Sequence, residues 1–158
     1  MGYALKSKGM YQSSEKAYQM ALLKKRSTGK SSMGEVSVYY QLSKVYDLDG
    51  KPDDALKILQ EGYLNTKSKT ENLLYVIGYR YIDKNIDVNK GIELLKSMLT
   101  GKHLVAGALS KSEDDINAEI AKGYFILKNT KEGKIYLDKS LKINPKNETA
   151  LKLKSTNY

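Results

Sequence analysis

The sequence predicts an all-α protein, a right-handed solenoid of antiparallel helix pairs. Apolar residues recur with helical spacing on both sides of Gly50, in the stretch from 39 to 63. The same pattern returns around four anchor residues, 36 to 42 positions apart: Ser14, Ala55, Gly91 and Gly133. Such a return is typical of stacked repeats, in which each helix pair buries its apolar face against its neighbours. We therefore expect one domain over residues 1–158.

The helix pair around Gly50 shows the repeated pattern most clearly. One face of each helix is formed by Tyr39, Leu42, Ser43 and Tyr46 before the turn and by Ala55, Ile58, Leu59 and Gly62 after it. Pro52 suits a first helical turn, where its missing N–H costs nothing. The small residues Ser43, Ala55 and Gly62 allow the two backbones to approach closely, and Gly50 turns the chain.

Four stretches of the chain align on this pattern. Residues 36–69 (VSVYYQLSKVYDLDGKPDDALKILQEGYLNTKSK) align without a gap, and so do residues 115–147 (DINAEIAKGYFILKNTKEGKIYLDKSLKINPKN). The stretch from 71 (ENLLYVIGYRYIDKNIDVNKGIELLKSMLTGKHL) has one extra residue, and residues 2–25 (GYALKSKGMYQSSEKAYQMALLKK) match only from the middle of the first helix.

These stretches resemble the tetratricopeptide repeat, which is a pair of helices. The first helix of that repeat has the pattern large-x2-Leu-Gly/Ala-x2-Tyr, and the pattern Gly-x4-Ala-x3-aromatic-x2-Ala follows it in the sequence. The resemblance implies full repeats at 36–69, 71–105 and 114–147 and a partial repeat at 2–25. Gly91 and Gly133 stand where the family usually has alanine, and a related family with longer helical repeats would also explain the uneven spacing.

The C-terminal stretch 148–157 is predicted to be a helix that closes the solenoid. Asn147 is its expected cap, and Ala150, Leu151 and Leu153 are expected to face inward. The first repeat begins midway and lacks such a closure. We therefore expect either a piece of a longer protein or self-association through the N-terminal repeat.

The sequence offers no candidate for catalysis, a metal or a cofactor, so we expect a chain that is not an enzyme. The stretch STGKSS (27–32) ends like a phosphate-binding loop, but Lys24 stands where that motif needs glycine. His103 is the only histidine and has no acidic residue nearby, and the chain contains no cysteine. Asp114 and Asp115 follow Ser112 at a predicted helix start, where acidic residues stabilise the helix end.

The resemblance implies a concave groove lined by the first helix of each repeat. Its rows are Ser37, Tyr40, Lys44 and Asp47; Asn72, Tyr75, Tyr79 and Ile82; and Asp115, Ala118, Lys122 and Phe125. From these we select as partner-binding residues Tyr40, Lys44, Asp47, Asn72, Tyr75, Tyr79, Ile82, Lys122 and Phe125. Tyrosine offers wide, stiff contact area with a polar tip, although Tyr40 and Tyr75 could instead only cover adjacent turns. The family's basic clamp for a C-terminal carboxylate does not carry over, because Tyr40, Tyr75 and Ala118 occupy its key position.

The net charge of +9 raises the question of an anionic partner. The densest basic patch is Lys24, Lys25, Arg26 and Lys30. Only two arginines occur and no base-reading motif is visible, so a nucleic acid is the less favoured partner. No apolar run is long enough to span a membrane. We expect a cytoplasmic location, or a periplasmic one if an export signal precedes this sequence.

The expected function is that of a non-catalytic bacterial scaffold or adaptor that binds a peptide or a partner helix in the groove. One alternative is an accessory domain of a larger enzyme or of an envelope-assembly protein, which the partial first repeat favours. A second alternative is a basic solenoid associated with nucleic acid.

Overall fold

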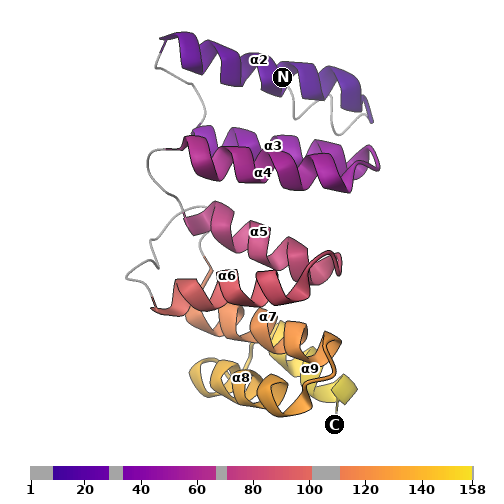
Figure 1. Cartoon of the computed structure of the whole chain (residues 1–158), viewed down its shortest axis with the longest axis vertical. Helices are drawn as coiled ribbons and strands as arrows, with labels where there is room; N and C mark the ends of the chain where they lie inside the picture. Colours follow the sequence, from indigo (N-terminus) through magenta and orange to yellow (C-terminus); the bar gives the residue numbers. More distant parts are fainter. Residues whose placement is uncertain (1–8, 29–33, 67–70, 101–110, 158) are drawn as a thin grey trace. The chain divides into compact units, whose positions relative to one another are not determined.

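The computed structural model describes residues 9–28, 34–66, 71–100 and 111–157, which form helices and no strand (Figure 1). The helices are α2 (Tyr11–Thr28), α3 (Glu35–Leu48), α4 (Pro52–Asn65), α5 (Glu71–Asp83), α6 (Val88–Thr100), α7 (Glu113–Ile126), α8 (Thr130–Ile143) and α9 (Glu148–Asn157). The predicted all-α fold is confirmed. None of the helices in the described ranges is both long enough and apolar enough to cross a membrane.

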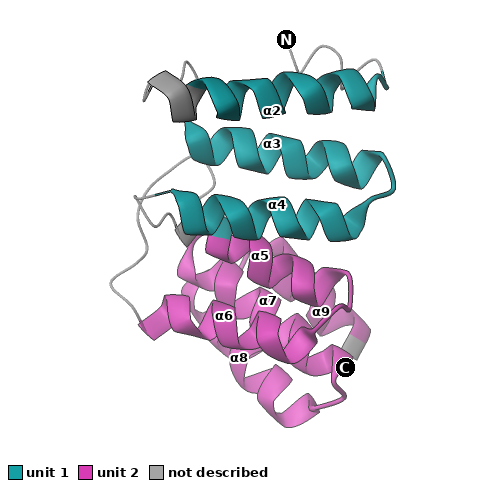
Figure 2. Ribbon diagram, turned by 45° about the horizontal axis from the view of Figure 1, so that its top comes forward, with its two compact units in different colours: residues 1–73 teal, residues 74–158 magenta. Residues whose placement is uncertain are grey.

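The chain divides into two compact units, residues 1–73 and residues 74–158 (Figure 2). The expectation of a single domain stays a prediction. The helix pairs α3–α4, α5–α6 and α7–α8 match the expected repeats, although α3 and α7 each begin one residue earlier than expected. Helix α2 covers the second half of the partial repeat and extends three residues beyond it. Two residues named in the sequence analysis, Lys30 and His103, lie outside the described residues.

In the first unit, α3 and α4 pack through the small residues that the sequence singles out. Tyr39, Leu42 and Leu59 are fully buried, and so is Ala55. A Cβ atom added to Gly62 would lie 2.5 Å from Cγ of Tyr39. The tyrosine ring therefore occupies the space that a side chain at position 62 would need.

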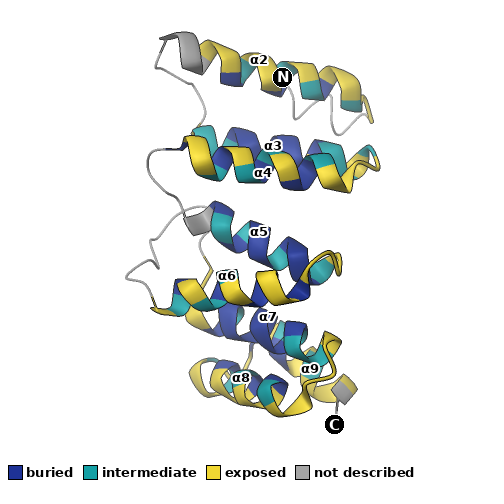
Figure 3. Ribbon diagram, viewed as in Figure 1, coloured by how far each residue is buried: buried dark blue, intermediate teal, exposed yellow. Residues whose placement is uncertain are grey.

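The second unit has its main core where α5, α6 and α7 meet. Its buried members are Tyr75, Ile82, Val88, Ile92, Leu95, Met98, Ile116 and Ile120. The helix α7 carries buried residues along most of its length (Figure 3). The helices α5 and α6 approach at two glycines, since a Cβ atom on Gly91 would lie 2.8 Å from the backbone oxygen of Gly78.

The three turns inside the helix pairs share one backbone design. Gly50, Asn85 and Lys128 all have positive φ, at 73°, 52° and 58°. The next residue of each turn donates its N–H to a carbonyl five positions back: Lys51 to Tyr46 at 2.8 Å, Ile86 to Tyr81 at 3.1 Å, and Asn129 to Tyr124 at 2.9 Å. This is the glycine-type helix end in which a left-handed residue satisfies the last carbonyls.

Because lysine has a Cβ that disfavours the left-handed region, Lys128→Gly is expected to raise the free energy of unfolding by about 0.5–1 kcal/mol. Gly50→Ala, the reverse change at the equivalent turn, should lower it by about 1 kcal/mol. Urea denaturation followed by circular dichroism measures both. A Lys128→Gly variant that unfolds at a lower urea concentration than the parent would show that the positive φ of Lys128 does not destabilise the folded chain.

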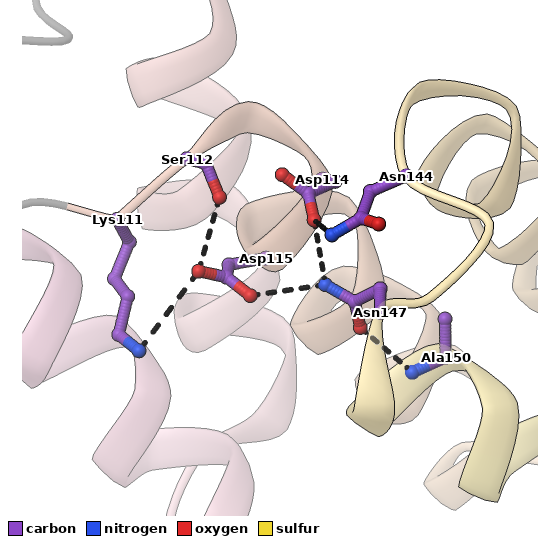
Figure 4. Close-up of polar contacts among 7 residues, drawn as sticks. All are labelled: Lys111, Ser112, Asp114, Asp115, Asn144, Asn147 and Ala150. Atoms are coloured by element: carbon purple, nitrogen blue, oxygen red, sulfur yellow. Dashed lines mark hydrogen bonds and ion pairs between the residues drawn. The ribbon is translucent and has the colours of Figure 1, made fainter.

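The closing helix α9 is tied to the start of α7 by Asn147 (Figure 4). Its side-chain oxygen accepts from the N–H of Ala150 at 2.9 Å, which confirms the predicted cap. Its amide donates to Asp114 at 2.8 Å and to Asp115 at 3.0 Å. These two aspartates begin α7 as expected, and their side chains also hold α9 in place.

One inward residue of α9 was assigned wrongly. Ala150 is fully buried and Leu153 packs against the cluster around it, but Leu151 is 46% exposed. A helix turns by about 100° per residue, so Leu151 lies off the face that residues 150 and 153 share.

Candidate functional site

The candidate site is a surface formed by α5 and α7, here called the α5–α7 face. Its residues are Tyr75, Tyr79 and Asp83 on α5, Lys111 just before α7, and Asp115, Glu119 and Lys122 on α7. In both helices these positions follow spacings of three or four, which places the side chains of each helix on one side. All seven of these residues belong to the second compact unit.

Lys122 joins the two helices. Its Nζ donates to Oδ1 of Asp83 at 2.8 Å and lies 5.4 Å from the ring centre of Tyr79. Burial alone would raise the pKa of Asp83, but hydrogen bonds from Lys122 and Lys84 outweigh it and hold the pKa below its usual value. Asp83 therefore stays ionised at neutral pH and holds the lysine across the face.

The two tyrosines of α5 form the aromatic part of the face. Their ring centres lie 6.3 Å apart with an angle of 15° between the planes. Tyr79 is half-buried and Tyr75 is buried, and burial raises the pKa of both hydroxyl groups. Lys111 lies 5.9 Å from the ring centre of Tyr75, so each ring has a cation nearby.

Glu119 is the most unusual group of the face. Its side chain is only 9% exposed, and among the described residues its Oε2 atom has no hydrogen-bond partner. The Nζ atom of Lys122 lies 4.0 Å from that oxygen. Burial raises the pKa of Glu119 to about 7. At neutral pH this carboxyl is therefore divided between its protonated and ionised forms.

The structure brings three of the predicted groove residues together on this face: Tyr75, Tyr79 and Lys122. Two others lie elsewhere in the second unit. Ile82 is fully buried in the core, and Phe125 packs where a Cβ atom on Gly133 would approach it to 2.7 Å. Neither side chain lines the α5–α7 face, so both are left out of the site considered below.

The remaining predicted groove residues belong to other parts of the chain. In the first unit, Lys44 is exposed and lies 4.8 Å from the ring centre of its own neighbour Tyr40, while Asp47 is half-buried. The side chain of Asn72 lies outside the described residues. Whether these positions contact a partner stays a prediction.

The basic patch is described only in part. Lys24 is exposed on α2, but the side chains of Lys25 and Arg26 and all of Lys30 lie outside the described residues. Within the described ranges, no three histidine, aspartate or glutamate side chains are grouped to hold a metal ion.

Sequence reasoning missed Asp83, Lys111 and Glu119. Their signal was present: Asp83 continues the spacing of Tyr75 and Tyr79 along α5, and Glu119 stands four residues after Asp115. The family's groove pattern instead selects Ala118 and Phe125 on this helix, and Ala118 directly precedes Glu119 in the sequence. Ala118 is fully buried in the cluster that includes Ala150 of α9, while Lys122 of the same row contacts α5.

Comparison with known proteins gives a consistent result for the fold. The sequence pattern of the tetratricopeptide repeat family matches residues 115–147. Among solved structures, YrrB, described as a tetratricopeptide-repeat protein with an unusual peptide-binding site, is 19% identical with a TM-score of 0.69, over 98% of this chain and 71% of its own. MamA is 18% identical with a TM-score of 0.65, over 92% of this chain and 75% of its own.

A third similar structure is a putative kinesin light chain of Podosopora anserina with nearly identical repeats. It is 15% identical with a TM-score of 0.66, over 96% of this chain and 77% of its own. The comparison with curated proteins gives no match. At these identities the similarity to solved structures establishes the fold.

Proposed function

Since residues 115–147 form a tetratricopeptide repeat and the chain has the fold of tetratricopeptide-repeat proteins, we propose that it is a protein-interaction module that binds an extended peptide or a partner helix on the α5–α7 face. The observation that carries this proposal is the pair of stacked tyrosines with charged side chains across from them. Stiff aromatic rings beside fixed charges are typical of surfaces where a few residues supply most of the binding energy.

The arrangement of the face favours binding over a purely structural role. Tyr79 remains half-exposed, and Lys122 is fixed by Asp83 instead of extending into solvent. A partner that covers this surface gains apolar contact on a ring that needs little further ordering, which lowers the entropic cost of association. YrrB is described as having a peptide-binding site, which supports the same kind of role for the present chain.

Tyr79→Ala is expected to weaken peptide binding about tenfold or more, because it removes a central aromatic contact. Peptides selected against the full chain from a random 12-residue display library would serve as ligands, and fluorescence anisotropy would measure their affinity. The matched control is Tyr63→Ala, which removes a half-buried tyrosine from α4 in the first unit. Both variants should keep the helical circular dichroism of the parent.

Binding that survives Tyr79→Ala but is lost in Tyr63→Ala would place the partner surface outside the α5–α7 face. A selection that returns no binding peptide from repeated rounds would contradict the proposed function itself.

A further inference from the structure

The three carboxylates of the α5–α7 face, Asp83, Asp115 and Glu119, are not equally well paired. Asp83 has two lysines beside it, because Lys84 also lies 3.4 Å from its Oδ2 atom. Lys122 donates to Asp83 at 2.8 Å, and Lys111 lies 3.9 Å from Asp115. Asp115 also accepts from Ser112 at 3.1 Å and from Asn147 at 3.0 Å. Within the described ranges Glu119 forms one ion pair, a long one of 4.0 Å to Lys122, whose Nζ already donates to Asp83.

The burial of Glu119 makes this weak pairing costly. Its side chain is more than nine-tenths buried, and among the described residues no group donates a hydrogen bond to Oε2. A buried carboxylate without a donor is unfavourable, and a cation with N–H groups relieves it. The tyrosines of α5 lie near enough that the charge of Glu119 acts on both hydroxyl groups. The unsatisfied oxygen therefore belongs to the same face as the two rings.

We propose that the segment bound on the α5–α7 face carries an arginine side chain whose guanidinium pairs with Glu119 beside Tyr75 and Tyr79. This inference rests on the proposed function and specifies the chemistry of the partner. A guanidinium is planar, carries several N–H donors and is weakly hydrated, so it can bond a carboxylate while it lies against an aromatic ring.

Lys111 is the side chain that we expect the arginine to displace. Lys111 has a side chain that is 45% exposed, and its contact with Asp115 is long at 3.9 Å. An exposed ion pair of this kind contributes little free energy. The incoming arginine takes the place of Lys111 over the ring of Tyr75, while Lys122 stays bonded to Asp83. An acidic group of a partner would instead be repelled here, because it would meet the weakly paired carboxylate of Glu119.

The test uses the peptides selected against the full chain. An arginine is expected at one fixed position of the peptides that bind this face. Replacing it with citrulline, which keeps the shape but not the charge, should weaken binding about tenfold or more at pH 8, and glutamate should weaken it further. Glu119→Gln should remove the preference for arginine over citrulline. The matched control is Glu93→Gln, which changes an exposed glutamate on α6. This variant should keep the preference for arginine over citrulline.

The preference should also depend on pH. Burial raises the pKa of Glu119 to about 7, and a bound guanidinium favours the ionised form. The affinity of the arginine peptide should therefore rise about tenfold between pH 5.5 and pH 8, with no such rise for the citrulline peptide or for Glu119→Gln. In the part of the chain that the structure describes, the other charged or titratable groups that face Glu119 are Asp83, Asp115, Lys111, Lys122, Tyr75 and Tyr79.

Three results would overturn the inference while the proposed function stands. These are peptides that bind the face without arginine, a lysine peptide that binds as tightly as the arginine peptide, and an arginine preference that persists in Glu119→Gln. If Tyr79→Ala leaves the binding of every selected peptide unchanged, the site itself is wrong and the proposed function fails with it.

Discussion

Gly91→Ala is expected to lower the free energy of unfolding by about 2 kcal/mol, one of the two largest effects that we predict. The new Cβ atom would lie 2.7 Å from Cγ1 of Ile82, 2.8 Å from the backbone oxygen of Gly78 and 3.0 Å from Cβ of Tyr81. A backbone oxygen cannot rotate away as a side chain can, so α5 and α6 must separate. Overpacking of this kind costs about 1–3 kcal/mol, and the helix propensity of alanine offsets only part of it.

Two other glycines serve as controls for this substitution. Gly34 has no atom within 4 Å of an added Cβ, so Gly34→Ala should change the stability by less than about 1 kcal/mol. Gly133→Ala should fall between the two, because its close neighbours are ring atoms of Phe125 that can tilt. Urea denaturation curves give the three free energies. A Gly91→Ala variant as stable as the parent would mean that the two backbones do not approach as described.

The helix pairs could be predicted from the sequence because their signals are local. The spacing of Tyr39, Leu42 and Leu59 fixes which side of each helix is buried, and Gly62 marks the point where a tyrosine ring takes the place of a side chain. The turn at Gly50 was also predictable, since a left-handed residue there favours glycine. Asn85 and Lys128 adopt the same left-handed conformation, but neither is a glycine, so these two turns could not be predicted in the same way.

The candidate site was only partly predictable because it depends on how one helix pair covers the next. Tyr79 and Lys122 follow from the repeat pattern, but their contact joins residues 43 positions apart. Ala118 and Glu119 are neighbours in the sequence, and only the packing of α9 decides that Ala118 is enclosed with Ala150. Glutamate is rarely buried, so the burial of Glu119 could not be predicted from its residue type.

Glu119→Gln is expected to stabilise the folded chain by about 2–3 kcal/mol at pH 8 and to have little effect at pH 4. Burial raises the pKa of Glu119 from an ordinary 4.5 to about 7, with Lys122 opposing and Asp83 adding to the effect. A folded-state pKa above the unfolded one means that the folded chain binds the proton more tightly. The parent should therefore lose stability as the pH rises from about 4.5 through about 7, at about 1.4 kcal/mol per pKa unit.

Glutamine is neutral at every pH, so it imitates the protonated glutamate and removes this loss. The measurement is the difference in unfolding free energy between Glu119→Gln and the parent, taken by urea denaturation at pH 4, 6 and 8. Groups that titrate equally in both proteins cancel in this difference. Glu93→Gln makes the same chemical change at an exposed position and should stabilise the chain far less at pH 8, because an exposed carboxylate keeps its water on folding. A flat difference for Glu119→Gln would show that this carboxyl is as well solvated in the folded chain as in the unfolded one, and that the face carries no unsatisfied charge for a partner to pair.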